Sequence, residues 1–142
     1  MPKDTYLEGR ILTADPVELV HILYEHVQAQ VRAARTARET NDIRGVGQAI
    51  CKALGALGEL EASLNHDAGG AISRNLARLY QYMRKRLTDA NMKKDTAALT
   101  EVESLVRTLD EGWLAMRRST AVPAASTYAF AAAESLEHAW SA

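Results

Sequence analysis

The sequence is poor in aromatic residues, proline and cysteine. Only 6% of its 142 residues are aromatic and three are proline, while Ala, Leu, Glu and Arg fill long stretches. This mix favours helix over strand. Cys51 is the only cysteine, which excludes an internal disulfide and fits the reducing environment of the cytosol.

An excess of charge of one sign and a long apolar run are also missing. Seventeen basic residues face eighteen acidic ones, for a formal charge of −1. There is thus no general attraction to phosphate backbones or anionic membranes. The start, MPKDTY, has no apolar signal core, and no stretch approaches the roughly 20 apolar residues that span a bilayer. We therefore expect one cytoplasmic domain that neither binds nucleic acid nor inserts into a membrane.

Apolar residues recur at three- and four-residue steps in four segments, which predicts four amphipathic helices. The predicted helices cover 16–39, 43–65, 71–91 and 96–117. Pro16, Asp42 and Asp95 stand where helix starts favour proline or a capping carboxylate, and Asn91 is expected to end the third helix in the left-handed conformation. With short connections, these helices bury their stripes only against one another. The prediction is an all-α, antiparallel, up-down four-helix bundle.

The ends of the chain differ from the predicted bundle. Residues 1–118 are expected to form the bundle domain, in which 1–14 are an N-terminal arm, and 119–142 an alanine-rich tail. Tyr128, Ala132, Leu136 and Trp140 recur at every fourth residue of the tail. An isolated helix of this length is marginal in water, so the tail is either a short fifth helix docked on the bundle or a disordered extension.

A long segment of the third predicted helix is similar to a known family. The run NLARLYQYMRKRLTDANMKKD at 75–95 resembles the signature of the flagellar secretion chaperone FliS. The likeness extends to TADPVEL at 13–19, to GGAI at 69–72 and to 109–113, and covers roughly residues 6–116. One departure is His26, where the family commonly has a glycine.

The resemblance implies a cytoplasmic helical bundle without cofactor or enzymatic activity. It implies binding to the disordered C-terminal segment of flagellin, which prevents premature polymerisation, and delivery of flagellin to the flagellar export apparatus. No glycine-rich phosphate loop, nucleophile elbow or pair of catalytic carboxylates argues for an enzyme.

The start of the first helix offers one candidate surface for such a client. Its first turns are apolar around most of their circumference, including Leu19 and Ile22, which is wider than the stripe of an ordinary surface helix. Part of this surface needs another cover. The N-terminal arm, through Tyr6, either packs there permanently or covers a groove that the client takes.

A stripe of small residues on the second predicted helix offers another candidate surface for the client. Gly47, Cys51, Gly55, Gly58 and Ala62 follow one another at three- or four-residue steps. Each glycine inside a helix costs about 0.5–1 kcal/mol relative to alanine, and close approach by a second helix is the physical benefit. That helix is either the client's or a neighbour within the bundle.

On the third helix, Tyr80 is expected to be semi-buried and Tyr82 to face solvent or the client. The predicted client-binding residues are Tyr6, Leu19, Ile22, Gly47, Cys51, Gly55, Gly58 and Tyr82.

The alternative function is a metal-binding helical bundle that uses carboxylates and histidine. Glu18 and His21 have the Glu-x-x-His spacing of di-iron bundles, and Glu25 lies one turn further on. Such a site needs a second Glu-x-x-His and further inward carboxylates, and the sequence contains no second copy. A solvated helix face is therefore favoured, and no metal is expected. The run Arg84-Lys85-Arg86 points in three directions on a helix and is not expected to form one phosphate-binding patch.

Overall fold

A computed structural model describes residues 16–119, and the structure below is that of this range. It contains four α-helices and no strand: α2 (Pro16–Glu39), α3 (Ile43–Ala62), α4 (His66–Lys93) and α5 (Thr96–Ser119). The predicted all-α bundle is confirmed. The predicted arm, with Tyr6, and the predicted tail helix lie outside the described residues.

Local signals set the helix ends. The Asp42 carboxylate accepts a hydrogen bond from the Gly45 N–H at 3.0 Å, and the Asp95 carboxylate accepts one from the Ala98 N–H at 3.2 Å, so both predicted caps are present. The prediction for Asn91 is wrong. It lies inside α4, and Lys94 takes the left-handed conformation at φ 56° instead. The helix continues past Asn91 because the cap that starts α5 comes only at Asp95.

A glycine divides α4 into a short first turn and a long regular helix. Gly70 has φ 53° and ψ −126°, a backbone conformation that L side chains rarely adopt. Asn65 caps the first turn by accepting from the Ala68 N–H at 3.1 Å. Regular helix therefore begins at residue 71, as the spacing predicted, although the first turn starts at His66.

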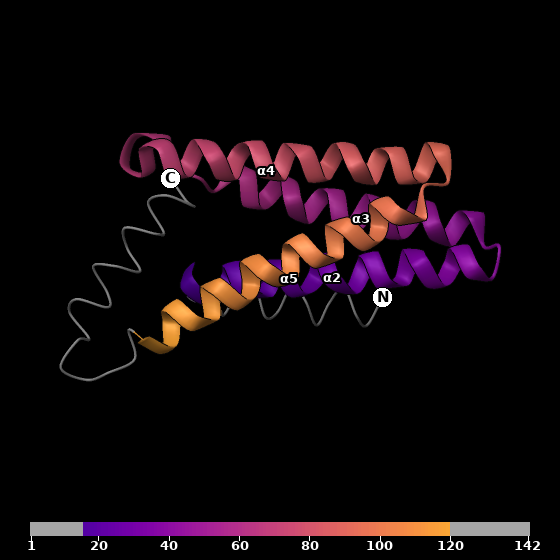
Figure 1. The fold of residues 1–142 in the computed structure, drawn as a ribbon, viewed down its shortest axis with the longest axis horizontal. Helices are drawn as coiled ribbons and strands as arrows, with labels where there is room; N and C mark the ends of the chain where they lie inside the picture. Colours follow the sequence, from indigo (N-terminus) through magenta and orange to yellow (C-terminus); the bar gives the residue numbers. More distant parts are fainter. Residues whose placement is uncertain (1–15, 120–142) are drawn as a thin grey trace.

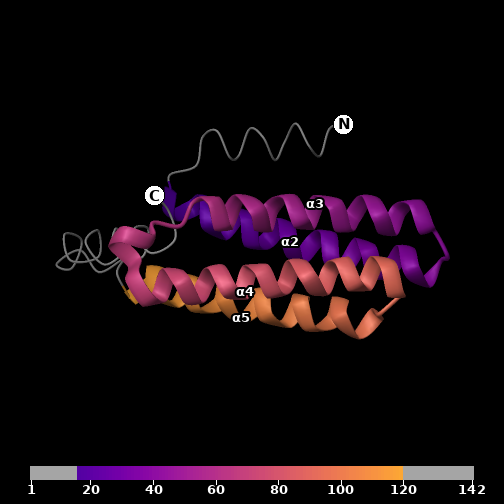
Figure 2. The same cartoon turned by 90° about the horizontal axis from the view of Figure 1, so that it is seen from above.

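The four helices form an up-down bundle in which α2 packs on α3 and α5, and α4 packs on the other side of the same two helices. In Figure 1, α4 runs along the upper edge, and α5 crosses obliquely from the end of α4 toward the start of α2. The loops that join α2 to α3 and α4 to α5 lie at one end of the bundle, and the start of α2 and the end of α5 lie at the other (Figure 2). None of the described helices is long and apolar enough to cross a membrane.

One core lies between all four helices. Fully buried side chains come from each of them, and each such Leu, Val or Met contributes roughly 1.5–3 kcal/mol relative to an exposed position. The core includes Val27, Val31, Leu57, Leu60, Met83, Leu87, Leu99 and Val102. The apolar spacing of residues 72, 76, 79, 83 and 87 predicts that Ile72 is buried, but it is 59% exposed, while the neighbouring Ser73 is 0% exposed.

Two tyrosines meet inside this core. The hydroxyl groups of Tyr24 on α2 and Tyr80 on α4 are 2.8 Å apart and both residues are 0% exposed. Tyr80 is thus fully buried, not semi-buried as predicted, because its hydroxyl finds a partner on the helix opposite. Burial raises the pKa of both hydroxyl groups far above the ordinary range of tyrosine, so both stay protonated.

Candidate functional site

The small-residue stripe lies on the outer side of α3. Cys51 and Gly55 are exposed and Gly47 and Gly58 are half-buried, whereas the core residues of this helix lie on its other side. Apart from the adjoining stretch of α3 itself, no described residue has an atom within 4 Å of a Cβ built on Gly47, Gly55 or Gly58. The explanation by a close neighbour within the bundle is therefore wrong for the described residues. These glycines weaken the helix without allowing any closer packing of the four helices.

A pocket of about 470 Å³ lies along α2, on the side that faces α5. It is lined by His21, Ile22, Glu25, His26, Gln28, Ala29, Arg32 and Asp110. Ile22 is only 1% exposed and contributes to the apolar lining of the pocket. The other predicted residue of α2, Leu19, is half-buried and packs against the core. The excess of apolar residues at the start of α2 is thus divided between core and pocket.

The polar side chains around this pocket bind one another. His21 lies between two carboxylates, with Nδ1 2.6 Å from an Asp110 oxygen on α5 and Nε2 2.9 Å from a Glu25 oxygen on α2. Arg32 donates from Nε to Glu103 on α5 at 2.8 Å and from Nη2 to the side-chain amide oxygen (Oε1) of Gln28 at 3.3 Å. The bonds to Asp110 and Glu103 join α2 to α5, and those to Glu25 and Gln28 lie within α2, so the polar rim of the pocket is held in place by the bundle itself.

The predicted metal ligands are used in these contacts. His21 and Glu25 pair with each other, and Asp110 takes the second ring nitrogen of His21. Among residues 16–119, no group of three or more His, Cys, Asp or Glu residues is arranged to hold a metal ion. Glu18, one turn earlier, belongs to no such group. The structure therefore does not favour the metal-binding alternative.

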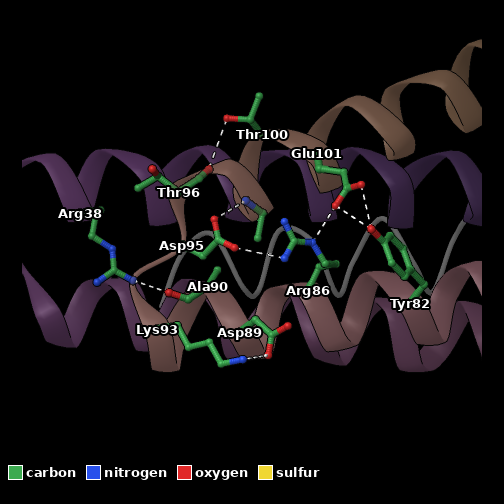
Figure 3. A network of polar contacts seen from close by, with 11 residues as sticks. Arg38, Tyr82, Arg86, Asp89, Ala90, Lys93, Asp95, Thr96, Thr100 and Glu101 are labelled. Atoms are coloured by element: carbon green, nitrogen blue, oxygen red, sulfur yellow. Dashed lines mark hydrogen bonds and ion pairs between the residues drawn. The ribbon is translucent and has the colours of Figure 1, made fainter.

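Tyr82 lies on a different part of the surface, at the seam between α4 and α5 (Figure 3). The side chain is 44% exposed, and its hydroxyl donates to Glu101 on α5 at 2.8 Å. Arg86 donates to the same carboxylate at 2.7 Å and to Asp95 at 3.1 Å. The bonds from Arg86 and then Tyr82 lower the pKa of Glu101. Tyr82 is thus accessible but held in one orientation by a charged partner.

The seven predicted client-binding residues in the described range are spread over three helices. Gly47, Cys51, Gly55 and Gly58 share the outer side of α3, Leu19 and Ile22 belong to α2, Tyr82 belongs to the α4–α5 seam, and Tyr6 lies outside the described residues. Sequence reasoning missed the link from His21 to Asp110, which are 89 positions apart. No sequence pattern linked this pair, because the only signal at His21 was its local spacing from Glu18.

Comparison with known proteins identifies close relatives for most of the chain. The sequence model of the family described as "Flagellar protein FliS" matches residues 2–120. The chain is 34% identical over 108 residues to the flagellar secretion chaperone FliS of Salmonella typhimurium, covering 75% of this chain and 80% of that protein. It is 36% identical over 107 residues to the flagellar secretion chaperone FliSB of Pseudomonas aeruginosa, covering 75% and 85%. With FliS of Bacillus subtilis the identity is 33% over 112 residues, covering 79% and 83%.

Proposed function

This chain belongs to the FliS family of flagellar proteins, and we propose that it is a cytoplasmic chaperone, not an enzyme, that binds the C-terminal segment of flagellin. By covering this segment it prevents premature polymerisation and delivers the subunit to the flagellar export apparatus. Membership of the family and the names of its relatives support an export chaperone. The client and its mode of binding rest on the surface of this bundle.

The proposal rests mainly on the glycines of the outer side of α3. Three glycines there meet no described atom within 4 Å of their Cβ positions, yet each costs about 0.5–1 kcal/mol of helix stability. A helix of the client that lies on this stripe approaches the α3 backbone more closely than it could approach any larger residue. We therefore propose Gly47, Cys51, Gly55 and Gly58 as the floor of the client site.

Contacts on two other helices belong to the same proposal. Leu19 and Ile22 lie on α2, where Ile22 lines the pocket that faces α5, and Tyr82 offers an exposed aromatic ring at the α4–α5 seam. Contact with all of them requires a client that wraps around the bundle. A large interface suits a disordered client, because ordering it on binding costs roughly 2–5 kcal/mol or more. Tyr6 is proposed to compete with the client for this surface.

Calorimetric titration with a synthetic flagellin C-terminal peptide tests the proposal. Burial of apolar surface on binding gives a negative heat-capacity change, so the heat of binding should become more exothermic as the temperature rises. Binding heat that is absent over a range of temperatures contradicts the proposed client.

A leucine on the stripe then locates the site. Gly55→Leu places a large side chain on the outer side of α3, in open space, and should keep or slightly raise the melting temperature while abolishing peptide binding. Gly112→Leu is the matched control, because Gly112 is an exposed glycine of α5 with the same open surroundings. Equal binding by both variants places the client elsewhere. Unfolding of Gly55→Leu alone indicates that this face is internal.

A further inference from the structure

The helix α4 differs from the rest of the chain in charge. It contains six basic residues and two acidic ones, whereas the whole chain has 17 and 18. It also carries three of the four large apolar side chains that are exposed in the described range, Ile72, Tyr82 and Met92. A helix that serves only as a wall of the bundle needs neither property on its outer side.

Three of the six basic residues of α4 form ion pairs with described residues. Arg84 reaches Glu61 on α3 at 3.3 Å, and Arg86 reaches Glu101 and Asp95 on the α5 side at 2.7 and 3.1 Å. Lys93 lies 3.8 Å from Asp89 within α4. The run Arg84-Lys85-Arg86 therefore spreads in different directions, as predicted: Arg84 pairs toward α3, Arg86 toward α5, and Lys85 is exposed without an ion pair to a described residue.

The remaining three cations share one line on the surface. Arg74, Arg78 and Lys85 are exposed and form no ion pair with any described residue. They are separated by four and seven residues, so on a helix with 3.6 residues per turn they fall on the same side over about 16 Å. Met92, which is 77% exposed, continues this line two turns beyond Lys85. We call Arg74, Arg78, Lys85 and Met92 the α4 stripe.

We propose that the α4 stripe binds an acidic, amphipathic segment of a partner protein, whose carboxylates pair with the three cations and whose apolar residues contact Met92. Charge complementarity selects this partner. Three cations are fewer than the four to eight in a typical segment that binds anionic lipid, and three phosphate contacts hold nucleic acid only weakly at physiological salt. The α4 stripe is separate from the glycines of α3, and the proposal does not depend on the flagellin site.

Fluorescence anisotropy with the full chain tests the proposal. The probes are a labelled acidic peptide, (Glu-Glu-Leu-Ala)4, and a control peptide with Lys in place of Glu. The acidic peptide should bind more tightly than the control peptide, and more weakly as salt is raised. Arg74→Gln/Arg78→Gln/Lys85→Gln should weaken this binding at least about fivefold. The control triple, Arg44→Gln/Lys52→Gln/Arg107→Gln, removes three exposed cations from α3 and α5. It has the same net charge and should change the affinity less than twofold.

If both triple variants lose the same affinity for the acidic peptide, binding depends only on the net charge of the protein, and the proposal is overturned. Phosphatidylserine vesicles or single-stranded DNA that bind more tightly than the acidic peptide, through the same three residues, also overturn it in favour of those ligands. Flagellin peptide binding should be unaffected by the α4 triple variant. Its loss there contradicts a separate surface, whereas loss of flagellin binding in Gly55→Leu alone leaves this proposal intact.

Discussion

Alanine substitutions on α3 separate the stability of the helix from its use as a binding surface. Among the described residues, none packs where a Cβ on Gly47, Gly55 or Gly58 would lie, so Gly→Ala at each position removes backbone entropy from the unfolded chain without strain within the bundle. Each change should stabilise the protein by about 0.5–1 kcal/mol, and the three together by roughly 1.5–3 kcal/mol. The melting temperature should rise by roughly 3–12 °C.

The same three methyl groups should weaken client binding. A helix seated on the glycines has to move outward to admit them, and such overpacking typically costs about 1–3 kcal/mol. That corresponds to a loss of roughly five- to 150-fold in the affinity for the flagellin peptide. Urea denaturation followed by circular dichroism measures the first effect, and calorimetry with the peptide measures the second.

Gly112→Ala is the matched control for the triple variant. Gly112 is an exposed glycine of α5 with open surroundings, so its substitution should raise stability by about 0.5–1 kcal/mol and leave peptide affinity unchanged. A triple variant that gains stability and keeps full affinity would show that the glycines do not seat the client. A triple variant that loses stability would show instead that the outer side of α3 is packed in the free protein.

Three further predictions concern the bundle. Tyr80→Phe should destabilise it by about 1–3 kcal/mol, because the buried Tyr24 hydroxyl loses this partner, and Tyr24→Phe/Tyr80→Phe should cost less than the sum of the single changes in a denaturation cycle. Partial burial works against ionisation of Glu103, but hydrogen bonds from Arg35 and Arg32 on α2 outweigh it and lower its pKa. The stabilisation that ionised Glu103 provides is therefore present above about pH 4.3 and is lost as the pH falls through the lowered pKa. With Glu103→Gln, the free energy of unfolding should fall less steeply between about pH 5 and 3, as measured by denaturation at each pH. Gly45→Ala should destabilise by about 1 kcal/mol in thermal unfolding, unlike the α3 outer glycines, since its Cβ lies 2.8 Å from Asp42 Cγ and displaces that cap.

The fold could be predicted from the sequence because its signals are local and periodic. Apolar residues every three or four positions fixed the four helices, and Asp42 and Asp95 marked two of the starts correctly. The end of α4 was predicted at Asn91 because asparagine favours the left-handed conformation, yet Lys94 adopts it. The helix α4 continues to Lys93, two residues before the cap of the next helix at Asp95. The preference of a single asparagine for the left-handed conformation does not predict this end point.

The candidate site was predictable only in part, because burial and long-range pairing decide what a residue does. The periodic small residues of α3 were visible in the sequence, but whether they faced a neighbouring helix or open space depended on how the bundle closes. His21 drew attention through its spacing from Glu18, whereas its actual partner on the neighbouring helix, Asp110, is 89 positions away. No periodicity within one segment reveals such a pair.

The outer sides of α3 and α4 are the two places where packing of the bundle fails to explain the sequence. Gly47, Gly55 and Gly58 lower the stability of α3 and allow no close contact with another described helix, and Arg74, Arg78 and Lys85 on α4 add like charge without an ion pair in the described range. Gln81 and Arg84 reach across the seam to Glu61 at 2.8 and 3.3 Å, so a band of satisfied polar bonds lies between the two surfaces. A client helix that needs close contact with backbone fits the first surface, and a segment that needs cations fits the second. The border of paired charges between them allows each surface to bind its own partner, so variants in one should leave the affinity of the other unchanged.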